Sequence, residues 1–465
     1  MATAGILLSA PTGVPAMTRD ERGLPLSTDS TEAAVLFDRA VEHYLKFHAD
    51  TMALVGRMLA ADPRFALGHC FKGYLLLSAA NPAYASEIAA TLAAAEAGSA
   101  TATPRERQHV AAFAAWSNGA LDRALQIWRQ ILDAHPTDLL AVRICDTNWF
   151  RHGQTAKILE QADRLAPHWS AELPGYDCFQ TIWAFAHEEA GDTSGAERAV
   201  DAAIARDRSN YFAHHVKAHV MEMECRPREG RDWLASQVGD WSLGNQLIHH
   251  LWWHRALMEL ELGELDAVLA SYDSNIRNLD EPMTKAMPDH FVDLQNAPAL
   301  LWRLEQMGVE VGHRWQELAD KAEARIGEAG HPLLVPHLMM ALAATGRAEA
   351  AGRFLGALRD LARDNASWTA PGIVEAVLPA CEAALAHRQG DYARAVDLLA
   401  PRREQIRLLG GSNAQRDLFT QMLVDAAVKS GRGDIVGDII ADQAANRTVP
   451  PTERAGYAAA ARWLA

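Results

Sequence analysis

Histidines gather in one part of this chain, and their spacing suggests a shared site. His215 and His219 are four positions apart, and His250 and His254 repeat that spacing. On an α-helix, residues four apart lie one above the other on the same face. Each pair can therefore direct two imidazole rings to one place.

A carboxylate extends the first pair, because Glu222 lies three positions after His219. Imidazoles at this spacing, with a carboxylate beside them, suit a divalent metal such as zinc or iron at about 2.0–2.2 Å per ligand. The metal interpretation uses five candidate ligands: His215, His219, Glu222, His250 and His254.

Two other interpretations explain the same residues without a metal. In one, the imidazoles carry out acid–base catalysis or bind an anionic or aromatic small molecule, with Trp252, Trp253 and Tyr211 as walls. In the other, the imidazoles are structural, each hydrogen-bonded within a packed helix pair. An unpaired buried polar group costs on the order of 1–3 kcal/mol, so a structural cluster has to satisfy every ring.

The neighbouring histidines divide into one further candidate and two residues that face elsewhere. His187 lies at the end of the preceding A-type helix, expected near 175–190, and is followed by Glu188 and Glu189, so it is a further ligand-binding candidate. His214 and His249 point away from the candidate face on the helical wheel, which predicts core or surface roles.

The elements that position these residues are helices, because apolar residues recur every three or four positions and almost never alternate. A glycine followed by an alanine four or five positions later returns along the chain, and the spacing from Gly119 to Gly153 is 34 and from Gly346 to Gly390 is 44. Helix, glycine turn and helix at this period indicate stacked helical hairpins. Helices are expected near 209–225 for the first histidine pair and near 243–262 for the second.

The predicted fold class is therefore all-α, an α-α superhelix or tetratricopeptide-like solenoid with one continuous core. We expect a leader over residues 1–26, either disordered or packed onto the solenoid, an N-terminal solenoid over 27–280 and its continuation over 281–465. The segment 278–289, with two prolines, is a candidate break between two stacks. A-type helices line the concave surface of such a solenoid, which places both histidine pairs there.

Several phrases of the sequence resemble the tetratricopeptide repeat protein 38 family. They are Pro104–His109, His135–Asp138, His214–Met223, His249–Leu257, Leu301–Leu304 and Gly410–Asp417. This resemblance implies an all-helical tetratricopeptide-like superhelix and no defined activity. Within the last phrase, Ser412 and Gln415 also predict a capping box that begins a helix.

Composition excludes several classes of protein. The chain of 465 residues has a formal net charge of −15 and no long basic run, which argues against nucleic-acid binding. It contains no stretch of 18 consecutive apolar residues, so we expect no transmembrane helix. Five widely spaced cysteines without a C-x-x-C pair fit a reducing cytoplasm.

The leading functional prediction is an interaction protein whose concave groove binds a protein segment, a peptide or a small ligand. The alternative is an enzyme, a hydrolase or lyase, metal-assisted or not, that uses the histidine and glutamate cluster on a small metabolite. Its ligand-binding candidates are His215, His219, Glu222, His250, His254, Trp253 and His187. A homodimer is also a prediction, whereas the cofactor is either none or a divalent metal such as zinc or iron.

Overall fold

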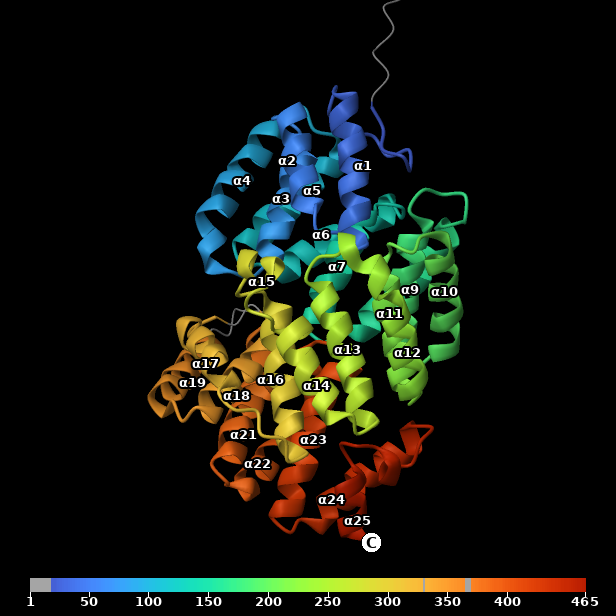
Figure 1. The fold of residues 1–465 in the computed structure, drawn as a ribbon. Coiled ribbons are helices and arrows are strands. Elements are labelled where there is room, and N and C mark those ends of the chain that lie inside the picture. Colours follow the sequence, from blue (N-terminus) through green and yellow to red (C-terminus); the bar gives the residue numbers. More distant parts are fainter. Residues whose placement is uncertain (1–17, 329–330, 364–368) are drawn as a thin grey trace, which may run out of the picture.

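The computed structural model describes residues 18–328, 331–363 and 369–465, and they form successive helical hairpins that wind into a superhelix (Figure 1). The N-terminal part contains α1 (Thr31–Leu45), α2 (Thr51–Ala61), α3 (Ala66–Ser78), α4 (Ala85–Gly98), α5 (Pro104–Ser117), α6 (Leu121–Ala134), α7 (Leu139–Arg151), α8 (Thr155–Leu165), α9 (Tyr176–Glu189), α10 (Thr193–Arg206), α11 (Tyr211–Met223) and α12 (Pro227–Gln237). Extended backbone pairs in the described residues only at two isolated bridges.

The C-terminal part continues the same pattern. It contains α13 (Leu247–Glu261), α14 (Leu265–Ser271), α15 (Pro282–Ala286), α16 (Phe291–Gln306), α17 (Arg314–Ala324), α18 (Leu334–Ala344), α19 (Ala348–Ala362), α20 (Ala370–Gly372), α21 (Leu378–Arg388), α22 (Tyr392–Leu399), α23 (Asn413–Lys429), α24 (Gly433–Asn446) and α25 (Ala458–Leu464). The predicted all-α superhelix is confirmed.

Local sequence signals define many helix ends. Gly119 adopts a φ of +80° between α5 and α6, a left-handed conformation that lets the chain reverse without a Cβ clash. The predicted capping box is present: Ser412 Oγ accepts from the Gln415 backbone N–H, and Gln415 Oε1 accepts from the Ser412 backbone N–H at 3.0 Å. Asn210 caps α11 by accepting from the Ala213 N–H, and it thereby fixes where the first histidine helix begins.

The predicted continuous core is wrong. Buried apolar side chains of the described residues form one large cluster between residues 26 and 220 and another between residues 253 and 460. A small third cluster, from Tyr211 to Met258, lies between them on α11, α13 and the segment from Leu234 to Trp241 that joins them. The interruption falls at these two helices and not at the predicted break over 278–289, because α11 and α13 carry imidazoles where the other helices carry hydrocarbon.

Distant segments of the superhelix contact one another and close it around its interior. The backbone N–H of Asn413 donates to Glu189 Oε1 at 2.9 Å, and Arg416 forms an ion pair with the same carboxylate at 3.1 Å. Further along, Arg454 pairs with Glu261 at 3.1 Å. The beginning of α23 is therefore held against the end of α9, and the segment before α25 is held against the end of α13.

The described part of the predicted leader is packed onto the first hairpins. Leu26 is buried, and Arg105 donates to the Pro25 carbonyl oxygen at 3.0 Å. Residues 1–17 lie outside the described residues. In the described part of the chain, no helix combines the length and apolarity that crossing a membrane requires.

Replacing Gly410 by alanine should destabilise the closed superhelix strongly. Gly410 has a φ of +70°, and a Cβ there would lie 2.1 Å from the Arg151 carbonyl oxygen at the end of α7. At Gly119 the φ is +80°, but a Cβ would meet nothing within 4 Å. We expect Gly119→Ala to cost about 1–2 kcal/mol of unfolding free energy from backbone strain alone, and Gly410→Ala several kcal/mol more. Urea unfolding measures both, and equal losses would contradict the close contact.

Candidate functional site

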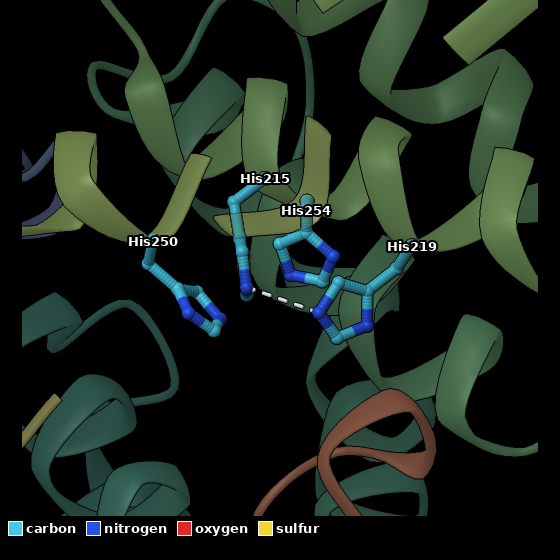
Figure 2. Close-up of side chains that lie close together, drawn as sticks. All are labelled: His215, His219, His250 and His254. Atoms are coloured by element: carbon cyan, nitrogen blue, oxygen red, sulfur yellow. Dashed lines mark hydrogen bonds between the residues drawn. The ribbon is translucent and has the colours of Figure 1, made fainter. Parts of the chain in front are cut away.

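The four histidines of the two predicted pairs converge on one place inside the protein (Figure 2). Helices α11 and α13 pack side by side, and each presents its pair toward the other. One ligand atom from each ring lies within 4.8 Å of the others. The ring centroids of His219 and His254 are 4.6 Å apart, and those of His215 and His219 are 4.3 Å apart. We call His215, His219, His250 and His254 the four-histidine cluster.

The cluster is enclosed by protein. The exposed fraction is 7% for His215, 1% for His219, 5% for His250 and 0% for His254. Apolar and aromatic neighbours account for much of the enclosure, and the ring of Trp253 stacks on His250 with centroids 5.0 Å apart. Burying four imidazoles removes them from water, so each ring nitrogen needs a partner.

Three of the four rings are held at Nδ1 by an oxygen from a neighbouring helix. Glu188 Oε2 of α9 lies 3.2 Å from His219 Nδ1, and Glu222 Oε2 lies 3.0 Å from His254 Nδ1. Asn296 Oδ1 of α16 lies 2.9 Å from His250 Nδ1. An oxygen at Nδ1 places the proton there and leaves Nε2 with a free lone pair, which is how metal-binding histidines are usually oriented.

The burial of the cluster favours neutral imidazole. Burial, reinforced by repulsion from His219 and His250, holds the pKa of His215 well below its usual range. The pKa of His250 falls to about 3, mainly through burial. Burial also lowers the pKa of His254, with repulsion from the other rings. Neutral imidazole is the form that binds a metal ion, so at these three rings no proton has to be displaced near pH 7.

His219 differs from the other three. Burial alone would lower its pKa, but the charge and hydrogen bond of Glu188 outweigh burial and raise it. Its Nε2 lies 3.0 Å from His215 Nε2, so one of these two nitrogens donates to the other in the absence of an ion. His254 Nε2 is buried and has no hydrogen-bond partner among the described residues. At least one imidazole nitrogen of the cluster therefore has a lone pair that accepts no hydrogen bond.

The other predicted site residues occupy different positions. Glu222 orients His254 from outside the cluster, and Trp253 lies against His250, so both adjoin the site. His187 does not belong to it, because its ring stacks on Trp183 and its Nε2 lies 2.9 Å from Asp163 at the surface. As expected, His214 and His249 lie apart from the cluster, with Trp241 and Asp293 as their respective partners.

A cavity of about 380 Å³ opens beside the cluster, and His215 and His250 form part of its wall. Most of its surface is apolar, and six of the lining residues carry aromatic rings. The rings come from Tyr44, Phe47, Phe150, Phe185, Phe212 and Phe291. The cavity exists because the superhelix closes, since residues from α1, α7, α11, α13 and α16 surround it.

Sequence reasoning missed the charged residues of this cavity. Arg143, Asp146 and Arg151 project from α7, one or two turns apart, and all three line it. The spacing of three between Arg143 and Asp146 was a usable signal, because it places these two charged groups on the same side of the helix. That this side faces the histidine helices follows only from the closure of the superhelix.

Fold and site together define a helical-repeat protein with a buried four-histidine cluster beside an aromatic cavity. No protein-family model matches the chain, so membership of the tetratricopeptide repeat protein 38 family stays a prediction. The solved structure of Naa15/Naa10 bound to HypK-THB resembles the chain at a TM-score of 0.25 and 14% identity, over 89% of this chain and 68% of that one. So distant a likeness transfers neither partner nor activity.

Asp146 should make the protein less stable as pH rises. Burial raises its pKa to about 8 in the folded protein, against an ordinary value of 3.8, while Arg143 opposes this shift. The folded state therefore prefers the protonated carboxyl, and its stabilising contribution is complete below pH 4 and lost as pH rises to 8. Asp146→Asn imitates the protonated form without titrating. The unfolding free energy of the variant relative to wild type should rise by roughly 1.4 kcal/mol per pH unit between pH 4 and 8.

Urea titrations at pH 5, 6, 7 and 8 would measure this difference. Parallel stability curves for the wild type and the variant would show that Asp146 is ionised in the folded protein. In that case the cavity would carry one negative charge more than we infer.

Proposed function

We propose that this protein binds a divalent transition metal through the four-histidine cluster and a small molecule in the adjoining cavity. The observation that carries the proposal is the convergence of four buried imidazoles whose ligand atoms lie within 4.8 Å of one another. Three of them are already oriented by oxygen partners at Nδ1. A set of ligands held in place by its neighbours loses little conformational freedom when an ion binds.

The donor atoms indicate which ions fit. Imidazole nitrogen suits zinc, iron, copper and nickel, whereas magnesium and calcium prefer oxygen. Zinc and iron agree with the expectation from the sequence. Bond lengths of about 2.0–2.1 Å to nitrogen would separate tetrahedral ligands by roughly 3.4 Å. The distance of 3.0 Å between His215 Nε2 and His219 Nε2 is close to this separation.

The position of the cavity supports an enzymatic use of the site. A bound metal supplies a Lewis acid that polarises a substrate oxygen, the chemistry on which a hydrolase or lyase depends. The chain contributes the rest: the imidazoles fix the ion, Glu188 and Glu222 fix the imidazoles, and the aromatic wall excludes water. His215 and His250 are the two cluster residues that line the cavity, so a substrate would approach the ion from their side.

The size of the cavity favours a small ligand over a protein segment. Small-molecule pockets typically measure about 300–1,000 Å³, and this cavity of about 380 Å³ falls within that range. Docking of a peptide along the concave face would need an open groove, which the contacts of Asn413 and Arg416 with Glu189 cover. An interaction surface elsewhere, a homodimer and a cytoplasmic location stay predictions.

Metal titration tests the proposal directly. Untagged protein, stripped with a chelator and titrated with Zn²⁺ or Fe²⁺ under reducing conditions, should bind close to one equivalent of one of these ions. His254→Gln removes a ligand and should weaken binding by at least roughly 100-fold, whereas Glu222→Gln removes only its orienting partner and should weaken it by roughly 10- to 100-fold. Calorimetry and elemental analysis provide the measurements.

The matched control is His187→Gln, which removes a surface histidine outside the cluster and should keep full affinity. Wild type that remains folded and takes up none of these ions would refute the proposal. So would equal binding by the His187→Gln and His254→Gln variants, because the ion would then lie elsewhere.

A further inference from the structure

The cavity beside the four-histidine cluster contains two arginines that lack an acidic partner. Arg143 lies under three aromatic rings, with its guanidinium carbon 4.5 Å from the Phe212 ring centroid and 4.9 Å from that of Phe47. Its Nε has no hydrogen-bond partner. Within the described residues its guanidinium forms no ion pair at 4.0 Å or less, and the carboxyl group that acts on its charge from farther away is Asp146. Aromatic faces attract a cation but do not neutralise it.

Arg151, two helical turns further along α7, is in a similar position. It donates to the Ser78 carbonyl oxygen at 2.7 Å and lies 5.4 Å from the Phe291 ring centroid. No carboxylate within the described ranges forms an ion pair with it either. Burial lowers its pKa to about 10, which still leaves it charged at neutral pH.

Among the described residues, Asp146 is the one acidic side chain on the cavity wall, and it does not balance these charges. Asp146 is held by Gln161 at 2.6 Å, and its pKa of about 8 keeps it mostly protonated at neutral pH. The cavity is thus positive inside a protein whose net charge is −15. A buried charge without a partner costs several kcal/mol, so a fold that keeps two of them gains most when an anion enters.

From this juxtaposition we propose that the cavity ligand is an aromatic or otherwise apolar carboxylate whose carboxylate group pairs with Arg143. The inference rests on the proposed small-molecule function and specifies its ligand class. The planar guanidinium offers paired donors that match a carboxylate. The rings of Phe47, Phe150, Phe185 and Phe291 offer apolar walls for the remainder of the molecule.

The placement of the two arginines favours a singly charged group over a phosphate. They are eight residues apart on α7, about 12 Å along the helix axis, so they do not converge on one group as donors around a phosphate dianion do. Arg143 is the arginine next to the cluster. It packs against Phe212, and the Phe212 ring stacks on His215, one turn further along α11. The carboxylate would therefore lie near the metal centre, and Arg151 would face the far end of the ligand.

Paired probes that differ only in charge test the inference. We would titrate wild type with 2-naphthoate, phenylacetate and decanoate, and separately with the corresponding neutral amides, by calorimetry and thermal shift. At least one carboxylate should bind at least roughly 10-fold more tightly than its amide, since a charge-assisted hydrogen bond is lost. Inorganic phosphate should not compete with the carboxylate. Competition by phosphate would show that the cavity binds phosphate and would overturn the inference.

Arginine variants locate the carboxylate. Arg143→Gln should weaken the best carboxylate by roughly 10- to 100-fold and leave the affinity for its amide unchanged. Arg151→Gln, as a second variant, should have the smaller effect. Arg129→Gln is the matched control, because Arg129 pairs with Glu160 at the surface. This variant should bind the carboxylate with the affinity of wild type.

The outcomes separate this inference from the proposed function when the same preparations are also titrated with metal. Protein that binds metal but shows no preference for any carboxylate over its amide overturns the inference alone. Carboxylate binding that depends on Arg143, in protein that takes up no metal, overturns the metal centre alone. Equal carboxylate affinity in the Arg143→Gln and Arg129→Gln variants also overturns the inference.

Discussion

Each helical hairpin of this protein has to cover its apolar face with a neighbour, and at α11 and α13 the covering surfaces are imidazole rings. Hydrocarbon faces pack in many ways, but buried imidazoles favour arrangements in which their nitrogens meet partners. Glu188, Glu222 and Asn296 supply a partner to one nitrogen of three of the rings, from three helices, whereas His215 Nδ1 and His254 Nε2 have none among the described residues. The relative positions of α9, α11, α13 and α16 are therefore fixed by polar contacts, and the two hydrocarbon cores assemble on either side of them.

The fold was largely predictable because its signals are local. A left-handed glycine at a hairpin turn, a capping box and a period of three to four are each written within a few neighbouring residues. Local signals failed where the pattern was weak or changed midway. Alanine fills both faces of α4, so no amphipathic pattern marks that helix, and α22 stops at Leu399, ahead of Pro401.

The site was predictable only in part, for a related reason. Sequence spacing shows which residues share a face of the same helix, so the pairs His215–His219 and His250–His254 could be recognised. The contribution of α7 could not, because residues 143 and 215 meet only when the superhelix has closed. His187 is the opposite case. Its place in the sequence made it a candidate for the site, but its ring turns outward to Asp163.

The contact between Gly410 and the end of α7 has a consequence for the shape of the cavity. The carbonyl of Arg151 lies against the backbone of Gly410, so the helix that carries the cavity arginines is held by a loop more than 250 residues away in the chain. The position of those arginines therefore depends on the packing of this distant loop, and a change in the loop would alter the cavity without touching any residue that lines it on α7.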